Sequence, residues 1–538
     1  MIWHIFRKDW KLLWPLVLLV AAAHVINAAT WFTLGYFEEP TGLRPVASNL
    51  PLVAILGIAI LIVTAVHQDP LPGDRQDWLV RPVRRRDLVL AKLLFIVTAV
   101  QAPLLLADLA QCLATGFSFR DSLSAALSRN VYELLCVSLP MLGLAAMTST
   151  IFEVIGGTLI IFLTIVVYTL VTQASTPNWD GALVFSKISN GWLALELASA
   201  GMLATAAIVI PLQYFRRATM RARGITAGAI CVLFLVSALL PWTSAFSFLQ
   251  WLSLDPGAGN AVAMAFDPTF GKFALKPGAL NPANSVWIPL HVSGLAPESI
   301  LLNDRTFVRI IRRDGGTLFA GLSTSAPQAR VVSHDISLDI NDFPVRTSAR
   351  GDVRTHQLIA LPPRIYELVS SQPVRIELDY ALTLFHIDAS DRVAALDGGK
   401  PIAKLGLCKT KIANTGDAVD LACLATREAP TCATFVLENA GNGQRNPALN
   451  FCTKFYLPYN AHFQPDAMAH FGRRLPFRDS QGLAKYPVDS AQLPQAQISI
   501  KTYQPVAHFL RHLTIPEIRL GDWVAQSGQI ATRTASPP

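Results

Sequence analysis

Few residues in this chain have the types and spacing that catalysis requires. The sequence contains no GxxxxGK[ST] phosphate-binding loop, no HExxH zinc helix and no GxSxG nucleophile turn. Among the histidines only His508 and His512 have a spacing that suits a metal, because residues four apart share one face of a strand or a helix. Phe509 follows His508 where HExxH has its glutamate, so two ordinary surface or packing histidines are favoured over a metal site. The sequence therefore predicts no catalytic residue, no metal and no cofactor in this chain.

Polar residues inside apolar runs are a second group that can carry chemistry. His24 and Asn27 lie three residues apart near the middle of the first run, on one helix face. A hydrogen bond between helices is the favoured interpretation, and a place on a substrate path is the alternative. Three acidic residues are expected near the outer ends of their spans: Asp108, Glu133 and Glu196. A fourth, Glu153, is expected near an inner end. At these positions the side chains can reach the membrane interface.

The segment from Gln68 to Leu88 has the highest density of interleaved charge in the first half of the chain. A loop that only sets membrane topology needs its arginines, but not its aspartates or the apolar Trp78–Val80. Those three residues predict a short interfacial helix that ends at Pro82. Arg84–Arg86 would then contact anionic headgroups or an acidic protein partner. A topology signal alone is the alternative.

Cysteine positions indicate the compartment. Cys112, Cys136 and Cys231 lie in apolar runs, where a thiol behaves as a small hydrophobic group. The other four cysteines cluster in the polar half with spacings of 15, 9 and 20, which suit disulfides in an oxidising compartment better than zinc: Cys408, Cys423, Cys432 and Cys452. Turn-forming stretches at 413–417 and 439–443 predict two hairpins and favour the pairs Cys408–Cys423 and Cys432–Cys452.

The elements that would position these residues fall into two halves. Of the 538 residues only 15% are charged, below the roughly 25% typical of soluble domains, and 52% are hydrophobic. Residues 1–250 carry 30 of the 82 charges, and the first half contains about seven apolar runs of bilayer-spanning length: Leu12–Leu34, Leu50–Val66, Val89–Leu113, Val131–Met147, Ile151–Thr172, Leu193–Leu212 and Ile225–Leu240. The net charge of +8 divides evenly between the halves, which argues against a nucleic-acid partner.

Basic residues set the expected orientation. With the N-terminus inside, twelve arginines and lysines fall in inner segments and four in outer loops. We therefore predict a multi-pass protein of a bacterial inner membrane, with a transmembrane domain at 1–245 and a periplasmic domain at 246–538.

The second half is expected to be β-rich and sandwich-like, as one large sandwich or two small ones. The strongest strand signal is the alternation of apolar and other residues over Val374–Phe385. Further strands are expected, with Gly, Pro, Asn and Asp clusters between them: Val286–Val292, Thr306–Ile311, Val331–Ile340, Thr434–Leu437, Ile498–Tyr503 and Val506–Leu513.

Residues 1–245 resemble the permease subunits of type-2 ATP-binding-cassette (ABC) exporters. In that family an acidic residue and a glycine precede a short apolar helix, a Pro-Val-Ser-Arg segment, and a Gly-Lys dipeptide that opens the next span. Here Asp77-Trp78-Leu79 occupies the helix position, Pro82-Val83-Arg84-Arg85 the Pro-Val segment and Ala91-Lys92 the dipeptide. Arg84 stands in place of the hydroxyl residue and Ala91 in place of the glycine. Residues 5–13 resemble the family's amphipathic entry helix. Such permeases usually have six spans, so a seventh span and the large outer domain are additions.

The resemblance implies export driven by a separate ATP-binding subunit, with ATP and Mg²⁺ bound on that partner and two permease subunits enclosing the path. The residues that would couple this chain to the ATPase are Asp77, Trp78, Arg81, Pro82, Arg84, Arg85 and Arg86. The second inner segment, Arg216–Arg223, is expected to be a topological anchor.

Two other functions remain open at this point. The chain can be a membrane anchor that displays the β-rich domain for sensing or assembly. It can also be a membrane enzyme with an outer active site, although no nucleophile–base spacing favours that. The sequence does not identify a transported lipid, peptide or drug-like molecule.

Overall fold

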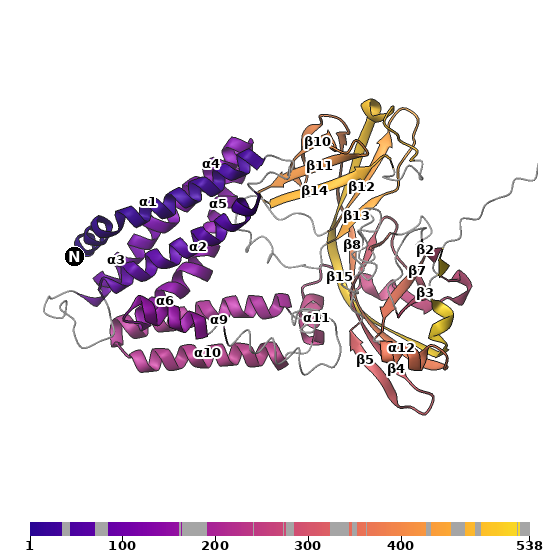
Figure 1. The fold of residues 1–538 in the computed structure, drawn as a ribbon, viewed down its shortest axis with the longest axis horizontal. Helices are drawn as coiled ribbons and strands as arrows, with labels where there is room; N and C mark the ends of the chain where they lie inside the picture. The colour runs from indigo at the N-terminus through magenta and orange to yellow at the C-terminus, as the bar shows by residue number, and fades with distance from the viewer. Residues whose placement is uncertain are drawn as a thin grey trace, which may run out of the picture.

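A computed structural model describes residues 1–34, 44–69, 84–160, 163, 191–239, 242–272, 274–275, 284–322, 344–346, 352–361, 363–426, 432–452, 469–478, 486–524 and 526–527. The described chain forms an N-terminal helical region followed by a β-rich region (Figure 1). The boundary predicted after residue 245 falls within α11, a helix that contacts the β-rich region.

The helical region is built from long helices, several of which contain a π-helical segment. Its elements are α1 (Ile2–Leu34), α2 (Arg44–His67), α3 (Arg85–Ile96), η2 (Val97–Gln101), α4 (Ala102–Thr115), α5 (Phe119–Glu133), η3 (Leu134–Ser138), α6 (Leu139–Met147), α9 (Gly191–Pro211), η4 (Leu212–Arg216), α10 (Thr219–Leu239) and α11 (Trp242–Trp251). Because η2 and η3 continue the helices on either side, α3–η2–α4 and α5–η3–α6 are two long antiparallel helices joined at Gly116, which adopts a left-handed conformation.

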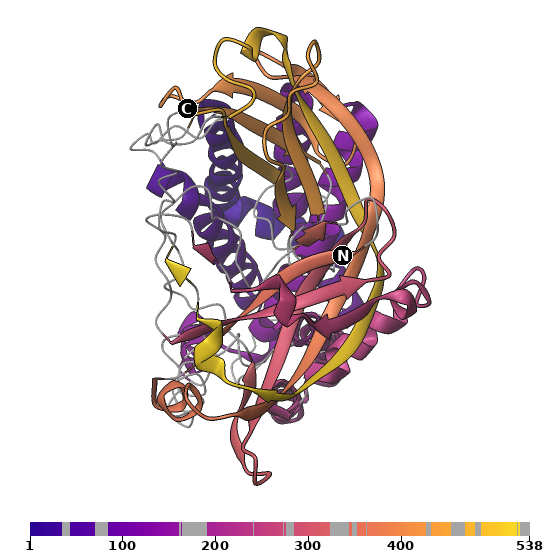
Figure 2. The same cartoon turned by 90° about the vertical axis from the view of Figure 1, so that its right-hand side faces the viewer.

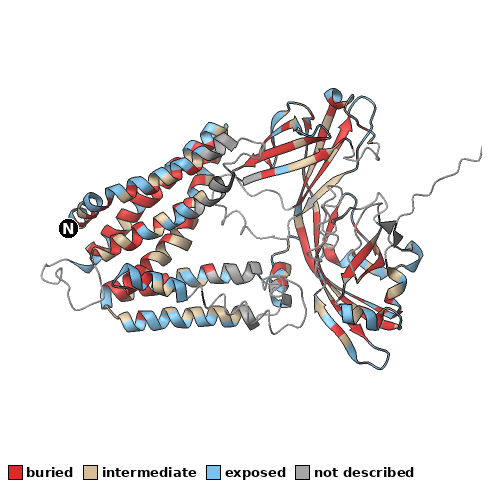
Figure 3. Cartoon of the chain, in the orientation of Figure 1, coloured by how far each residue is buried: buried red, intermediate tan, exposed pale blue. Residues whose placement is uncertain are grey.

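Four stretches of the described residues are long and apolar enough to cross a bilayer: Ile2–Ala29, Arg85–Thr115, Phe119–Met147 and Thr219–Val236. Their outward faces carry exposed Leu, Val, Ile and Phe side chains (Figure 3). Exposed apolar surface on this scale is unusual in a soluble monomer and is typical of helices that face lipid. Of the other expected spans, the second and the fifth contain shorter apolar helices, Val53–His67 and Ile151–Ile160. The fifth span beyond residue 163 lies outside the described residues.

The strands of the second region are β1 (Ala263–Phe266), β2 (Ala274–Leu275), β3 (Ser285–Ser293), β4 (Ile300–Ile311), β5 (Thr317–Leu322), β6 (Pro344–Arg346), β7 (Val353–Ala360), β8 (Val374–Ala394), β9 (Gly399–Ile402), β10 (Gly406–Ile412), β11 (Ala418–Ala425), β12 (Cys432–Asn439), β13 (Leu449–Cys452), β14 (Ala469–Pro476), β15 (Ala496–Ile518) and β16 (Gln526–Ser527), with the helix α12 (Pro363–Val369) before β8. The strands predicted at Val286–Val292, Thr306–Ile311 and Thr434–Leu437 lie in β3, β4 and β12. The strand predicted at Val331–Ile340 lies outside the described residues.

The strands form one large antiparallel sheet and smaller ones. The large sheet has the order β13-β12-β15-β8-β4-β5, with β6 also paired to β4. A three-stranded sheet has the order β1-β3-β7 and a four-stranded sheet the order β14-β11-β10-β9, while β16 and β2 form a short parallel pair.

Two unusually long strands, β8 and β15, run side by side through the large sheet (Figure 2). Register shifts between Thr502 and Tyr503 and between Pro505 and Ala507 interrupt their pairing. The first shift adds one residue to β8 and the second adds one residue to β15, so each strand reverses the alternation of its side chains once. The core-facing positions of β8 therefore change from even to odd numbers between Leu384 and Val393. The two strands predicted at Ile498–Tyr503 and Val506–Leu513 are therefore one strand, because Pro505 lies at a bulge and does not end it.

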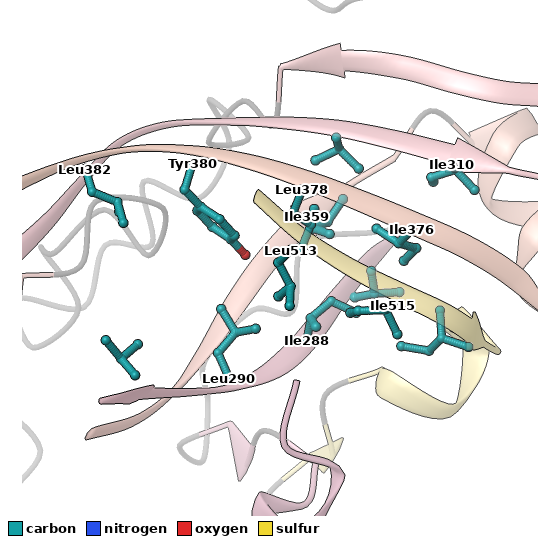
Figure 4. Close-up of a cluster of buried hydrophobic side chains, with 14 of the residues drawn as sticks. Ile288, Leu290, Ile310, Ile359, Ile376, Leu378, Tyr380, Leu382, Leu513 and Ile515 are labelled. Carbon is teal, nitrogen blue, oxygen red and sulfur yellow. The ribbon is translucent and has the colours of Figure 1, made fainter. Parts of the chain in front are cut away.

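The sheets enclose two hydrophobic cores that share β8 and β15. In the first core, strands β3 and β7 of the three-stranded sheet pack on β4, β8 and β15 (Figure 4). In the second, β10, β11 and β14 pack on β12 and the other ends of β8 and β15. The β-rich region is therefore neither one simple sandwich nor two independent ones, because one continuous sheet carries two separate cores.

Two disulfides connect neighbouring strands of the second region. Cys408 of β10 bonds Cys423 of β11, and Cys432 of β12 bonds Cys452 of β13. This pairing confirms the connectivity that the two predicted hairpins favoured. The cysteines of the helical region, Cys112, Cys136 and Cys231, form no disulfide.

Replacing Cys408 and Cys423 together by alanine is expected to lower the free energy of unfolding of the β-rich region by about 2–4 kcal/mol, because the bond restricts the unfolded chain. Thermal unfolding with and without reductant measures this loss, and non-reducing peptide mapping checks both pairs. Cys231→Ala is the matched control and is expected to change neither result. Seven reactive thiols in protein isolated without reductant would contradict the oxidising compartment.

Candidate functional site

The candidate site lies around the charged loop between α2 and α3. Residues 70–83, and with them Asp77, Trp78, Arg81 and Pro82, lie outside the described residues. Both flanks are described: Asp69 follows α2, and Arg84 has an extended backbone as the N-cap residue of α3. The two flanks contact each other and α1 through charged side chains.

A buried lysine connects the flanks to α1. The Nζ of Lys92, on α3, lies 2.8 Å from Asp9 Oδ2 of α1 and 2.9 Å from Asp69 Oδ2 after α2. It also donates to the carbonyl oxygen of Ala65 at 2.7 Å. Lys92 is only 2% exposed and Asp9 is fully buried. Lysine is almost never buried unless it is paired, and here two carboxylates and a carbonyl satisfy all three of its donors.

Asp69 also pairs with Lys8, whose Nζ lies 2.7 Å from Asp69 Oδ1. Burial by itself would raise the pKa of Asp69, but the ammonium groups of Lys92 and Lys8 outweigh it and hold the pKa below its usual value. We define Lys8, Asp9, Asp69 and Lys92 as the Lys92 cluster. It joins the start of α1 to both sides of the loop.

Aromatic packing explains why α1 and α3 approach closely enough for this cluster. The ring of Phe95 on α3 contacts the rings of Phe6 and Trp10 on α1 edge-on, with centroids 6.5 and 6.4 Å apart. Phe6 and Trp10 are four residues apart and so share one face of α1. Lys92 belongs to the Ala91-Lys92 dipeptide of the sequence motif, but its partners Asp9 and Asp69 were not predicted from the sequence. The available signal was that each charge lies at the border of an apolar run.

The arginine segments Arg84–Arg86 and Arg216–Arg223 approach one another at Arg85. Arg85 donates a hydrogen bond to the carbonyl oxygen of Phe215 in η4. Burial and the nearby Arg85 guanidinium lower the pKa of Arg217, which places the two cations within electrostatic range. The role of Arg216–Arg223 as a topological anchor stays a prediction, with Arg217 close enough to Arg85 for their charges to interact.

A second polar group lies within the helical hairpin. Ser138 Oγ donates to Glu133 at 3.0 Å, and Gln101 Nε2 donates to both Glu133 and Ser138. With its amide oriented to suit its neighbours, Asn130 donates to Gln101 Oε1 at 2.7 Å and accepts from the N–H of Leu105 at 3.1 Å. Gln101 and Ser138 belong to the π-helical segments η2 and η3, so both irregular turns meet at this network.

Two of the acidic residues expected at the interface are instead buried. Glu133 is the middle residue of the 29-residue stretch Phe119–Met147, because that helix begins twelve residues before the predicted span. Asp108 is buried and paired with Arg129 of α5. Glu153 is partly exposed and pairs with Arg223 at 3.1 Å, as a residue near a helix end can. The side chain of Glu196 lies outside the described residues.

His24 and Asn27 are both buried on α1, each 5% exposed. Arg129 of α5 lies within electrostatic range of His24. Their burial places them against other helices and not against lipid, which is where polar groups at that depth are expected.

The histidine pair on β15 has separate partners. His508 Nδ1 lies 2.8 Å from Thr383 Oγ1, whereas His512 Nδ1 lies 2.7 Å from Asp379 Oδ1. No cluster of three or more His, Cys, Asp or Glu side chains suited to a metal occurs among the described residues. His508 is buried because α11 covers it, with the ring of Phe246 edge-on at 6.2 Å.

Burial lowers the pKa of His508 to about 4, which makes the β-rich region sensitive to acid. Between pH 6.5 and 4 the unfolded chain binds a proton at His508 that the folded chain does not, so stability falls by about 3 kcal/mol as the pH falls through this window. His508→Asn, whose Oδ1 replaces Nδ1 as the partner of Thr383, is expected to remove this part of the slope. Unfolding at pH 7.5 and pH 4.5 measures the difference, and equal slopes for both proteins would contradict it.

Comparisons with known proteins give no family. No family model matches the chain, and no curated protein matches it. A solved structure of the Pseudomonas fluorescens alkylpurine DNA glycosylase AlkC, bound to DNA containing an abasic site analog, aligns with 69% of this chain and 93% of its own at 10% identity and a TM-score of 0.14. A TM-score this low shows no common fold and bears on neither structure nor function.

Proposed function

We propose that this chain is the permease subunit of an ATP-binding-cassette exporter, which moves a lipid, peptide or drug-like molecule across a bacterial inner membrane. A separate subunit binds and hydrolyses ATP, and two permease subunits enclose the path. The chain crosses the membrane about seven times, and its β-rich region lies in the periplasm.

The Lys92 cluster is the observation that carries this proposal. A permease must convert movement of a partner at its inner surface into movement of its helices, and a flexible loop would absorb that movement. Here the residue before the loop, Asp69, and the helix after it are tied through Lys92 to Asp9 of α1. A displacement of the loop therefore acts on three helices at once. An anchor that only displays a domain has no need of such a connection.

The exposed arginines at the start of α3 supply a docking face for that partner. Arg84, Arg85 and Arg86 begin α3 beside η4, and all three side chains are exposed. Such a surface favours an acidic protein partner at the inner membrane face. The sequence has no P-loop, so the energy source would reside in the partner.

The β-rich region supports the orientation. Its two disulfides are expected to persist only in an oxidising compartment. The arginine-rich loop belongs on the cytoplasmic side by the distribution of basic residues. The disulfides favour a periplasmic β-rich region, and the arginines favour a cytoplasmic loop, so both features support the same proposed orientation.

Co-purification tests the proposal. The tagged chain, isolated from its own membranes in mild detergent, is expected to bring down a P-loop ATPase in about equal amount, with ATPase activity in the same chromatographic peak. An unrelated tagged inner-membrane protein serves as the control. Recovery of folded chain with no nucleotide-binding subunit would contradict the exporter and favour the anchor that displays a β-rich domain.

A further inference from the structure

The helix α11 begins directly after a membrane-spanning helix. The candidate span Thr219–Val236 lies within α10, which ends at Leu239, and α11 begins at Trp242. Figure 1 shows α11 at the end of α9 and α10, next to β15. The position of α11 is therefore at the membrane surface, on the side of the β-rich region.

One face of α11 and of the residues that follow it is fixed to β15. Phe246 and Leu249 are buried. Ser253 Oγ accepts a hydrogen bond from the N–H of His508 at 3.0 Å, and the N–H of Asp255 donates to the carbonyl oxygen of Val506 at 3.0 Å. This face thus belongs to the β-rich region.

The other face is apolar and exposed. Trp251 is 76% exposed and Leu254 is 71% exposed, while Phe248 and Leu252 are also exposed. The rings of Phe248 and Trp251 lie 5.7 Å apart and form one patch. Residues 242–254 contain no charged side chain. A soluble surface rarely carries such a patch, whereas tryptophan and leucine are favoured where the headgroups meet the acyl chains.

We propose that Phe248, Trp251, Leu252 and Leu254 form a lipid-docking surface that inserts into the membrane interface and holds β15 at a fixed distance from the bilayer. Val232 and Leu235 of α10, the candidate membrane span that precedes α11 in the chain, are also exposed. Interfacial helices that recognise anionic lipids carry basic residues, and this segment has none. Its partner is therefore the uncharged interface. The proposal requires the membrane spans but not an exporter function.

Site-directed spin labels on the full chain in phosphatidylcholine nanodiscs test this surface. Cys112, Cys136 and Cys231 are replaced by serine, and the disulfide cysteines are kept. Single variants Leu254→Cys, Val232→Cys as a lipid reference and Leu368→Cys as an exposed reference in α12 are then labelled. The ratio of collisions with oxygen to collisions with a water-soluble nickel complex is expected to be several-fold higher at Leu254 than at Leu368, and close to that at Val232.

Each other outcome overturns the proposal in a defined way. A ratio at Leu254 equal to that at Leu368 would show that the patch lies in water. Protection from both reagents would show that protein covers it, such as a second copy of the chain. Adding anionic lipid is expected to leave the ratio unchanged, and a marked increase would contradict an uncharged partner. Loss of the exporter function alone would not affect any of these results.

Discussion

Replacing Lys92 with methionine is expected to lower the stability of the helical region by about 3–5 kcal/mol, because the change removes the cation that the fully buried Asp9 shares with the partly exposed Asp69. Asp9 is fully buried, so bulk solvent does not reach its carboxylate to replace the ammonium group. The fraction of chain that remains monodisperse after heating in detergent measures the loss. Lys92→Met is expected to aggregate at a clearly lower temperature than the unmodified chain.

Two further variants separate the charge effect from general damage. Lys8→Met removes a lysine whose side chain is 38% exposed, and a pair of that kind contributes at most about 1 kcal/mol. Lys92→Met combined with Asp9→Asn removes the stranded charge and is expected to recover much of the loss, because Asp69 keeps Lys8 as its partner. If Lys92→Met is as stable as Lys8→Met, the cluster does not hold the loop.

In the proposed exporter, replacing Arg84, Arg85 and Arg86 together by glutamine is expected to reduce ATP hydrolysis stimulated by the transported molecule to the level of the ATPase subunit alone. The three side chains are exposed at the start of α3, so the chain should still fold and insert. Asp77→Ala and Trp78→Ala are expected to act in the same direction. The measurement is ATPase activity of the reconstituted complex, with insertion checked separately.

The control must remove the same topogenic charge from elsewhere on the inner side. Arg216 and Arg217 do not qualify, because Arg85 contacts the neighbouring Phe215. Arg7, Lys11 and Arg221 are exposed and lie outside the loop, and their triple replacement by glutamine is expected to preserve stimulation. Normal stimulated hydrolysis in the Arg84–Arg86 variant, assembled with its partner, would leave the loop as a topology signal only.

Short sequence patterns correctly predicted the features that depend on neighbouring residues, namely the buried face of β8 and the disulfide pairs. All six alternate apolar residues from Val374 to Leu384 are buried, because a strand with one face on a core repeats every two residues. The disulfide pairs followed from turn residues between nearby cysteines, and a hairpin brings such residues opposite one another. These features depend on fewer than about 25 consecutive residues.

Features that depend on distant residues were not predictable from the same patterns. Asp9, Asp69 and Lys92 are brought together by helix packing, and their spacing along the chain carries no periodic signal. The span containing Glu133 was placed too late because Arg120, Asp121 and Arg129 interrupt the apolar run, although the helix continues through them. In β15, Pro505 has the appearance of a strand end, and only its pairing with β8 shows that it lies at a bulge.

The shared strands β8 and β15 also determine when the outer region can fold during synthesis. Both cores need β15, which follows every other strand of the large sheet along the chain. During synthesis the chain therefore exposes the apolar faces of β3, β4 and β8 until β15 is made. The hairpin closed by Cys408 and Cys423 involves only nearby residues and can oxidise earlier. The β-rich region therefore stays an open domain with exposed apolar strands until the last long strand pairs.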